Sequence, residues 1–141
     1  MPHPEITMTQ EGIHNPAEPR HYMRLKPVKG RVRVLREGAV LADSSRALRL
    51  LEVGKDLYDP VFYFPEEDVK AQLLPNDAKT HCPLKGDAAY FDLVGAEGRI
   101  AEQKIAWTYG EPFGFAEGLA GLIAFYADKV VFEEYPAGYD G

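Results

Sequence analysis

One short segment gathers several side chains that could do chemistry. Residues 80–86, which read THCPLKG, contain the chain's one cysteine, Cys82, with His81 directly before it and Lys85 three positions after it. A thiol beside cationic groups loses its proton more readily and reacts faster than a free thiol. The commoner role of a lone cysteine is to pack as a small apolar side chain. The segment therefore marks a candidate site, with Cys82 and Lys85 as candidate catalytic residues, but it specifies no reaction.

The backbone of this segment decides which of its side chains meet. Neighbouring side chains of a strand point to opposite faces, so His81 and Lys85 would both lie opposite Cys82, although Pro83 disturbs that register. This favours a structural thiol over a reactive one. Lys85 is the strongest polar candidate, because its position gains little from packing and its ammonium can reach an anionic ligand. The alternative is a solvated surface lysine.

Other candidates lie on predicted strands. Trp107 and Tyr109 share one strand face, and they would line a pocket with Tyr90 if their strands pair; ordinary aromatic core packing is the alternative. Glu52 shares a face with apolar residues, which predicts a half-buried carboxylate that needs an ion-pair partner on another strand. The predicted ligand-binding residues are His81, Cys82, Lys85, Tyr63, Tyr90, Trp107, Arg49 and Glu52.

We expect neither a metal nor a cofactor. His3, His14 and His21 lie in or beside the N-terminal segment, at spacings that match no ligand motif. The acids at 66–68 are better explained by the start of a helix, whose dipole favours negative charge there. We therefore predict that the protein carries no tightly bound zinc.

Composition indicates one soluble β-rich domain. Hydrophobic residues make up 45% of the 141 residues, and eight tyrosines with seven phenylalanines favour strands over helices. We expect an extended arm over residues 1–20, which hold four prolines, a domain over 21–135, and a tail over 136–141. One cysteine fits a reducing compartment, and neither a signal peptide nor a run of roughly 18 apolar residues is present. These features predict a cytoplasmic protein that does not enter membranes.

The net charge of −6 conceals a basic strip between residues 20 and 36. The strip contains no acidic residue and seven of the 16 basic ones: Arg20, Arg24, Lys26, Lys29, Arg31, Arg33 and Arg36. The acidic remainder of the chain argues against nucleic-acid binding, which depends on neutralising phosphates. The strip either cradles an anionic ligand or pairs with the chain's own acids, such as Glu133 and Glu134. The second alternative is favoured, because most charge runs are solvated faces.

The pattern of apolar and turn residues predicts short strands. Alternation at 31–35, a turn at Glu37 and Gly38, and a second apolar run at 40–42 indicate a hairpin. Pro65 followed by three acids predicts a helix over 65–74, which Pro75 would end. Further strands are predicted at 47–52, 61–64, 88–93 and 104–109, with a closing hairpin at 122–126 and 130–134. The predicted fold is a mainly β single domain of about seven short antiparallel strands, tent- or sandwich-like, with one short α-helix.

Several of these segments resemble one family when they are taken together and in order. They are 47–52, 62–69, 80–86, 89–90, 106–109 and 123–126. They resemble the bacterial family labelled domain of unknown function 427, over about residues 30–134. The resemblance implies a mainly β, tent-like fold with one short helix, and it implies no established activity.

Two properties associated with this family or with related folds, a nucleotidyltransferase activity and a four-cysteine zinc site, lack the required residues in this chain. The family has also been filed under a nucleotidyltransferase name, but such enzymes need a glycine–serine loop followed by paired carboxylates for metal, and neither is present. Related tent-like folds hold zinc with four cysteines, whereas this chain has one. Glu66 stands where the family often has an arginine, so a cationic contact is missing if that position touches a ligand.

Two classes of function remain open. The first is a small-ligand-binding domain, with a pocket around residues 80–86 that takes a small molecule, such as an anionic one. The second is an enzyme of unknown reaction centred on Cys82 or Lys85. A third reading is a protein-interaction module that uses the N-terminal arm. Ligand binding is favoured, because the sequence shows no acid–base constellation.

Overall fold

The computed structural model describes residues 12–15, 18–54 and 56–137. Over this part of the chain, eleven strands form three antiparallel sheets, and the helical residues belong to three short 3₁₀ segments. These segments are η1 (Glu66–Asp68), η2 (Ala96–Gly98) and η3 (Gly114–Leu119). The mainly β fold predicted from composition and periodicity is confirmed. No described helix has the length and apolar character needed to span a membrane.

The eleven strands are divided among three sheets, each with its own strand order. The first sheet has the order β1 (Ile13–Asn15), β2 (Glu18–Pro27), β5 (Leu48–Val53) and β6 (Val61–Tyr63). The second has the order β10 (Ile123–Phe125), β9 (Ile100–Thr108), β8 (Gly86–Val94) and β7 (Leu73–Cys82). The third has the order β11 (Val131–Pro136), β3 (Gly30–Arg36) and β4 (Ala39–Ser44).

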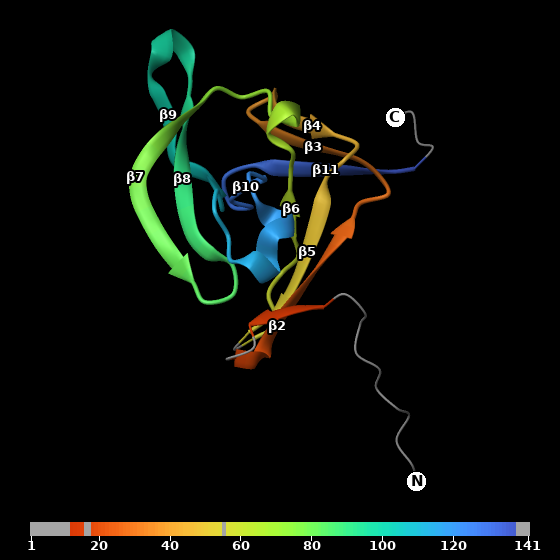
Figure 1. Ribbon diagram of the computed structural model, residues 1–141. Coiled ribbons are helices and arrows are strands. Elements are labelled where there is room, and N and C mark those ends of the chain that lie inside the picture. The colour runs from red at the N-terminus through yellow and green to blue at the C-terminus, as the bar shows by residue number, and fades with distance from the viewer. Residues whose placement is uncertain (1–11, 16–17, 55, 138–141) are drawn as a thin grey trace.

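The two four-stranded sheets are joined along one line and diverge from it, as Figure 1 shows for β7–β8 on the left and β5 on the right. Phe64, directly after β6, and Ile123 of β10 exchange two backbone hydrogen bonds of 2.8 and 2.9 Å. Ala116 and Leu119 of η3 belong to the same buried cluster as Met23 of β2. The junction and η3 therefore fix how the sheets face each other, and an open pocket lies between them.

The predicted helix over 65–74 is wrong. Only Glu66–Asp68 turn, as a 3₁₀ segment, and Val69 is already extended with φ −83° and ψ 121°. The backbone amides of Lys70 and Ala71 instead donate to the carbonyl of Leu41, at 2.8 and 3.0 Å. Pairing with the edge of β4 supplies hydrogen bonds that a helix would have made internally. Tertiary context thus overrides the local helix signal.

Pro75 also has a different role from the one predicted. It lies within β7, which is one of the two outer strands of its sheet. A proline is tolerated there because one side of an edge strand needs no ladder donors. The same residue that was expected to end a helix therefore sits inside a strand.

The predicted closing hairpin over 122–134 is wrong as well, although both of its strands exist. β10 pairs with β9 in the second sheet, whereas β11 pairs with β3 in the third. Apolar alternation sets where a strand forms but not which strand it pairs with. The predicted hairpin at 31–42 is correct, because β3 and β4 pair with each other.

The described part of the predicted arm includes β1 and the start of β2, which pair with each other. β2 thus begins at Glu18, before the predicted domain boundary at residue 21. Residues 1–11 and 16–17 of the arm and 138–141 of the tail lie outside the described residues.

Candidate functional site

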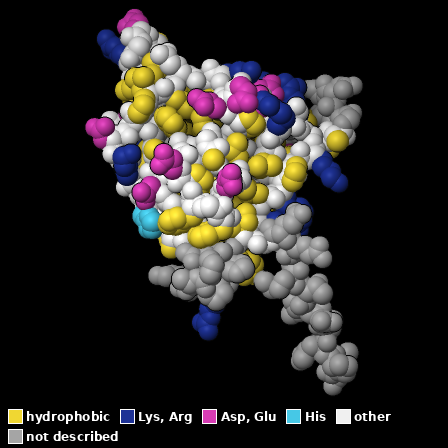
Figure 2. All heavy atoms as spheres, viewed as in Figure 1, with side chains coloured by type: hydrophobic (Ala, Val, Ile, Leu, Met, Phe, Trp, Pro, Cys, Tyr) yellow, Lys and Arg dark blue, Asp and Glu magenta, His cyan; other side chains and the backbone are white. Residues whose placement is uncertain are grey.

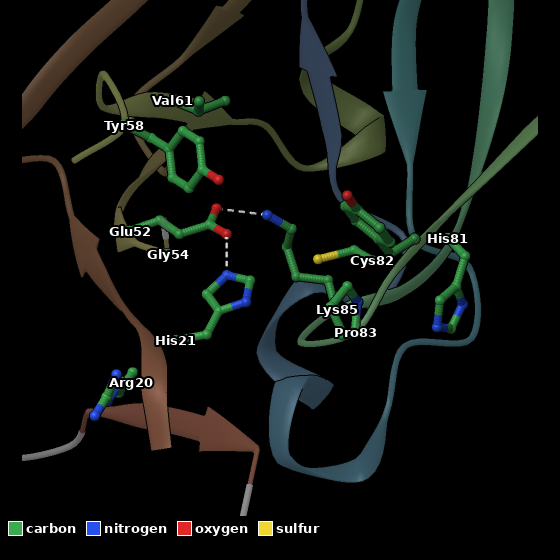
Figure 3. Close-up of a pocket in the computed structure, with 11 residues that line it drawn as sticks. Arg20, His21, Glu52, Gly54, Tyr58, Val61, His81, Cys82, Pro83 and Lys85 are labelled. Carbon is green, nitrogen blue, oxygen red and sulfur yellow. Dashed lines mark hydrogen bonds and ion pairs between the residues drawn. The ribbon is translucent and has the colours of Figure 1, made fainter. Parts of the chain in front are cut away.

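An open pocket of about 1020 Å³ lies between the two four-stranded sheets. Strands of both sheets and the turn after β7 contribute to its wall (Figure 3). Its lining consists of Arg20, His21, Glu52, Gly54, Tyr58, Val61, His81, Cys82, Pro83, Lys85 and Tyr109. Residues far apart in the sequence therefore meet in one cavity.

Glu52 of β5 is the centre of the polar part of this pocket. His21 of β2 donates from Nε2 to Oε2 at 2.6 Å, and Lys85 donates from Nζ to Oε1 at 2.5 Å. The three side chains are only 15%, 11% and 10% exposed, in the order His21, Glu52 and Lys85. The predicted need of Glu52 for a partner on another element is met twice. One partner comes from a neighbouring strand and the other comes from the opposite sheet.

The turn between β7 and β8 aims Lys85 into the pocket. Leu84 before it is fully buried, and the residue Lys85 itself is 8% exposed. The carbonyl of Lys85 accepts a hydrogen bond from the amide of Phe113 at 3.1 Å. The ammonium lies 5.8 Å from the centroid of the Tyr109 ring. Lys85 is therefore not the solvated surface lysine that was the alternative reading.

Cys82 faces the same polar group. Its sulfur points into the cavity in Figure 3, and its thiol is free and half-buried. The sulfur, a ring nitrogen of His21 and a carboxylate oxygen of Glu52 all lie within 4.8 Å of one another. The histidine close to the thiol is thus His21, which comes from a distant strand.

His81, the sequence neighbour of Cys82, points elsewhere. Its Nδ1 and a carboxylate oxygen of Asp87 are hydrogen-bonded at 2.8 Å, and both side chains are largely exposed. Its ring meets that of Phe113 edge-on. His81 contributes to the pocket wall but not to the Glu52 group.

A smaller aromatic cavity of about 210 Å³ continues from the main pocket, since Glu52 and Lys85 line both. The predicted residues Tyr63, Tyr90 and Trp107 line this cavity. Trp107 donates from Nε1 to the Tyr63 hydroxyl at 3.2 Å, while the Tyr90 hydroxyl shares a 2.7 Å hydrogen bond with Thr80. Burial raises the pKa of Tyr63, so its hydroxyl stays neutral. These hydrogen-bonded aromatic rings form a floor beside the charged groups.

Arg49 lies away from the pocket. It is on the face of β5 opposite Glu52, where it forms an ion pair with Glu134 and lies 5.2 Å from the centroid of the Phe62 ring. The structure therefore does not bring Arg49 together with the other predicted ligand-binding residues.

Three arginines of the basic strip, Arg31, Arg33 and Arg36, are paired with the chain's own acids, as the favoured alternative predicted. Arg31 binds Asp43 through two hydrogen bonds of 2.7 and 2.5 Å, which lower the pKa of that carboxyl. Arg33 contacts Glu133 at 3.5 Å. Figure 2 shows basic and acidic side chains side by side at the upper edge of the visible face. Arg20, which lines the pocket, is the member of the strip that reaches the site.

His21 is a member of the Glu52 group that was not among the predicted site residues. It reaches the site because β2 pairs with β5 in the register that sets Met23 opposite Glu52. The sequence did contain a signal, because His21, Met23 and Leu25 alternate with more polar residues. Such alternation is typical of a strand with one covered face, and Met23 is indeed buried and Leu25 half-buried. That signal predicts an inward-facing His21 but not its partner.

Comparison with known proteins adds a family but no activity. No curated protein matches the chain. A family model described as a domain of unknown function matches residues 24–135. Glu52, Cys82 and Lys85 lie inside the matched range, whereas His21 lies just before it. The chain belongs to the family of the domain of unknown function DUF427.

Proposed function

We propose that this protein binds a small anionic organic molecule in the pocket around Lys85. The observation that carries the proposal is a buried lysine whose ammonium reaches an open pocket of about 1020 Å³. Ligand sites are concave, largely apolar and equipped with a few convergent polar groups, and their volumes are commonly about 300–1,000 Å³. The pocket fits that description.

The charge of the lining favours an anion. Arg20 and Lys85 are cationic, and Glu52 is the one acid among the lining residues. This is a local reversal of the chain's net charge of −6. A cleft with a net positive charge and low-dielectric walls concentrates anionic ligands. A carboxylate or phosphate of the ligand would lie near the ammonium of Lys85 and the guanidinium of Arg20.

The remaining lining favours a ligand with an apolar or planar body. Tyr58, Val61 and Tyr109 supply aromatic and aliphatic contact next to the charged group. Burial raises the pKa of Tyr109, which keeps its hydroxyl protonated and available as a hydrogen-bond donor. We therefore favour small carboxylates or phosphates attached to a ring or chain over inorganic anions.

A thermal-shift screen of organic carboxylates and phosphates, run with EDTA present, tests the proposal. We expect at least one compound to raise the melting temperature of the wild type. Lys79→Met is the matched control, because Lys79 is an exposed lysine on β7. That control should respond like the wild type, whereas Lys85→Met should not respond.

Calorimetric titration of the same compound with Arg20→Gln provides a second variant in case Lys85→Met folds poorly. We expect about tenfold weaker binding, because one of two cations at the pocket is removed. Equal stabilisation of wild type, Lys79→Met and Lys85→Met, or no response across the screen, would contradict the proposal.

The alternative function is an enzyme that uses Cys82 as a nucleophile. The grouping of Cys82, His21 and Glu52 favours it, because an imidazole held by a carboxylate is the common way to activate a thiol. This alternative predicts that Cys82 reacts with iodoacetamide at neutral pH faster than free cysteine does. The rate should fall in His21→Gln and stay unchanged in His81→Gln.

A further inference from the structure

We propose that His21, Glu52 and Cys82 form a binding site for a divalent transition metal ion of the zinc type. Imidazole nitrogen, carboxylate oxygen and thiolate sulfur are the three protein donors that Zn²⁺ takes. Here one atom of each kind is present, and the three lie within 4.8 Å of one another. The site goes beyond anion binding, and neither proposal needs the other.

The distances are close to those of a coordinated ion. Donors placed about 2.0–2.3 Å from a tetrahedral ion lie about 3.3–3.8 Å from one another. The His21 Nε2 and Glu52 Oε2 atoms are 2.6 Å apart, so these two must separate by about 1 Å while the sulfur stays within reach. Cys82 is the last residue of β7, next to the turn.

Metal binding would move one proton within His21 and release one proton from Cys82. Before the metal binds, the N–H group at His21 Nε2 donates a hydrogen bond to Glu52 Oε2. On metal binding, the imidazole would carry that proton on Nδ1 and bind the ion through Nε2. The Cys82 thiol would release its proton to solvent, because metals are bound by the thiolate. No oxidant or reductant is required.

Lys85 is compatible with the ion. It binds Oε1 of Glu52 at 2.5 Å, whereas His21 binds the other oxygen, Oε2. An ion can therefore replace the contact at Oε2 while Lys85 keeps Oε1. Carboxylates that bind metals are commonly held by such an outer hydrogen bond, which orients them. The hydrogen bond from Lys85 thus keeps Glu52 oriented as a ligand.

The three donors leave the ion accessible. They come from β2, β5 and β7, and they all line the open pocket. Structural zinc sites are closed by four protein ligands, whereas sites with three keep a position for water or a substrate. With one thiolate, one carboxylate and Lys85, a divalent ion leaves the group with one net positive charge. The open position would accept an anionic donor.

A zinc-type site at these residues is the opposite of what the sequence predicted, which was a protein without tightly bound zinc. That expectation rested on local ligand spacing, but His21 and Glu52 are 31 positions apart and meet only through the pairing of β2 with β5. Local motifs reveal sites built on one hairpin or helix. They do not reveal a site whose donors come from three strands.

Cobalt provides the test, because thiolate-bound Co²⁺ has a charge-transfer band in the near ultraviolet. The full chain, free of any tag, is titrated with Co²⁺ alone under anaerobic reducing conditions, and Zn²⁺ is then added to displace it. We expect the band to saturate at one equivalent and to disappear with Zn²⁺. Cys82→Ser should abolish the band, and His21→Gln should weaken binding about tenfold or more.

Controls separate this site from the chain's other histidines. His81→Gln and a double His3→Gln, His14→Gln variant should bind Co²⁺ like the wild type, while Cys82→Ser is near-isosteric and should stay folded by circular dichroism. Absence of the band at saturating Co²⁺, or its persistence in Cys82→Ser, would overturn the metal site. The anion screen contains EDTA, so either proposal can fail while the other stands.

Discussion

At the scale of single residues, the site depends on Glu52, whose carboxylate accepts hydrogen bonds from both His21 and Lys85. Glu52 is 11% exposed, and each of its oxygens accepts a hydrogen bond from a different element. Removing charges from water is costly, so a buried ion pair adds little net stability, but breaking it leaves a charge without its counterion. Lys85 and Glu52 should therefore be strongly coupled in energy.

A double-mutant cycle measures this coupling. We expect Lys85→Met to lower the free energy of unfolding by about 3 kcal/mol, because Glu52 keeps its charge and loses its cation. The double variant Glu52→Gln, Lys85→Met should cost clearly less than the sum of the two single changes. Urea denaturation of the four proteins gives the values. Strictly additive losses would show that the two side chains do not interact.

At the scale of secondary-structure elements, the β7–β8 turn is what brings Cys82 and Lys85 to the pocket. Cys82 ends β7 and pairs with Gly86, which begins β8. Gly86 has φ +113°, a conformation that side chains with a Cβ rarely adopt. A Cβ built there would also lie 3.3 Å from the Cα of Pro112. The turn thus requires glycine for both its backbone and its space.

Gly86→Ala should for this reason lower the free energy of unfolding by about 2 kcal/mol. Gly110→Ala is the matched control, because its backbone has no positive φ and an added Cβ would have no neighbour within 4 Å. We expect that control to change stability by less than about 0.5 kcal/mol. Thermal or chemical denaturation of both variants makes the comparison. Equal stability of the two would mean that the turn relaxes freely.

At the scale of the whole molecule, buried tyrosines connect the two large sheets. Tyr63 of β6 is 1% exposed, and Tyr109, directly after β9, is 6% exposed. Burial is the main cause that raises the pKa of both hydroxyls above the ordinary value of 10.0. Their ionisation would put negative charge between the sheets. The folded protein therefore resists deprotonation of these groups.

Stability should consequently fall in alkaline solution. A group whose pKa is raised on folding contributes stability below its unfolded pKa, and that contribution is lost as the pH rises beyond it. We expect the free energy of unfolding to decline above about pH 10 and the tyrosinate absorbance of the folded protein to rise in two stages. Tyr63→Phe should flatten the decline. A single titration of all eight tyrosines near their ordinary pKa, with the fold intact, would contradict this.

The candidate site was predictable in part. The residues 80–86 stood out by type and spacing, and the half-buried face of β5 pointed to a partner for Glu52. His21 was not predictable as that partner. An alternating pattern shows that a side chain faces inward, but the register between β2 and β5 selects what it meets there.

The sequence by itself determined that the chain forms strands, and where most of them lie, because alternation and β-branched or aromatic side chains act over a few residues. Only the tertiary structure decided that β10 and β11 belong to different sheets and that residues 69–71 extend along β4. It also decided that His21, Glu52, Cys82 and Lys85 share one pocket. The physical reason is that backbone hydrogen bonds between strands are alike for every sequence, so pairing is selected by how the whole core packs.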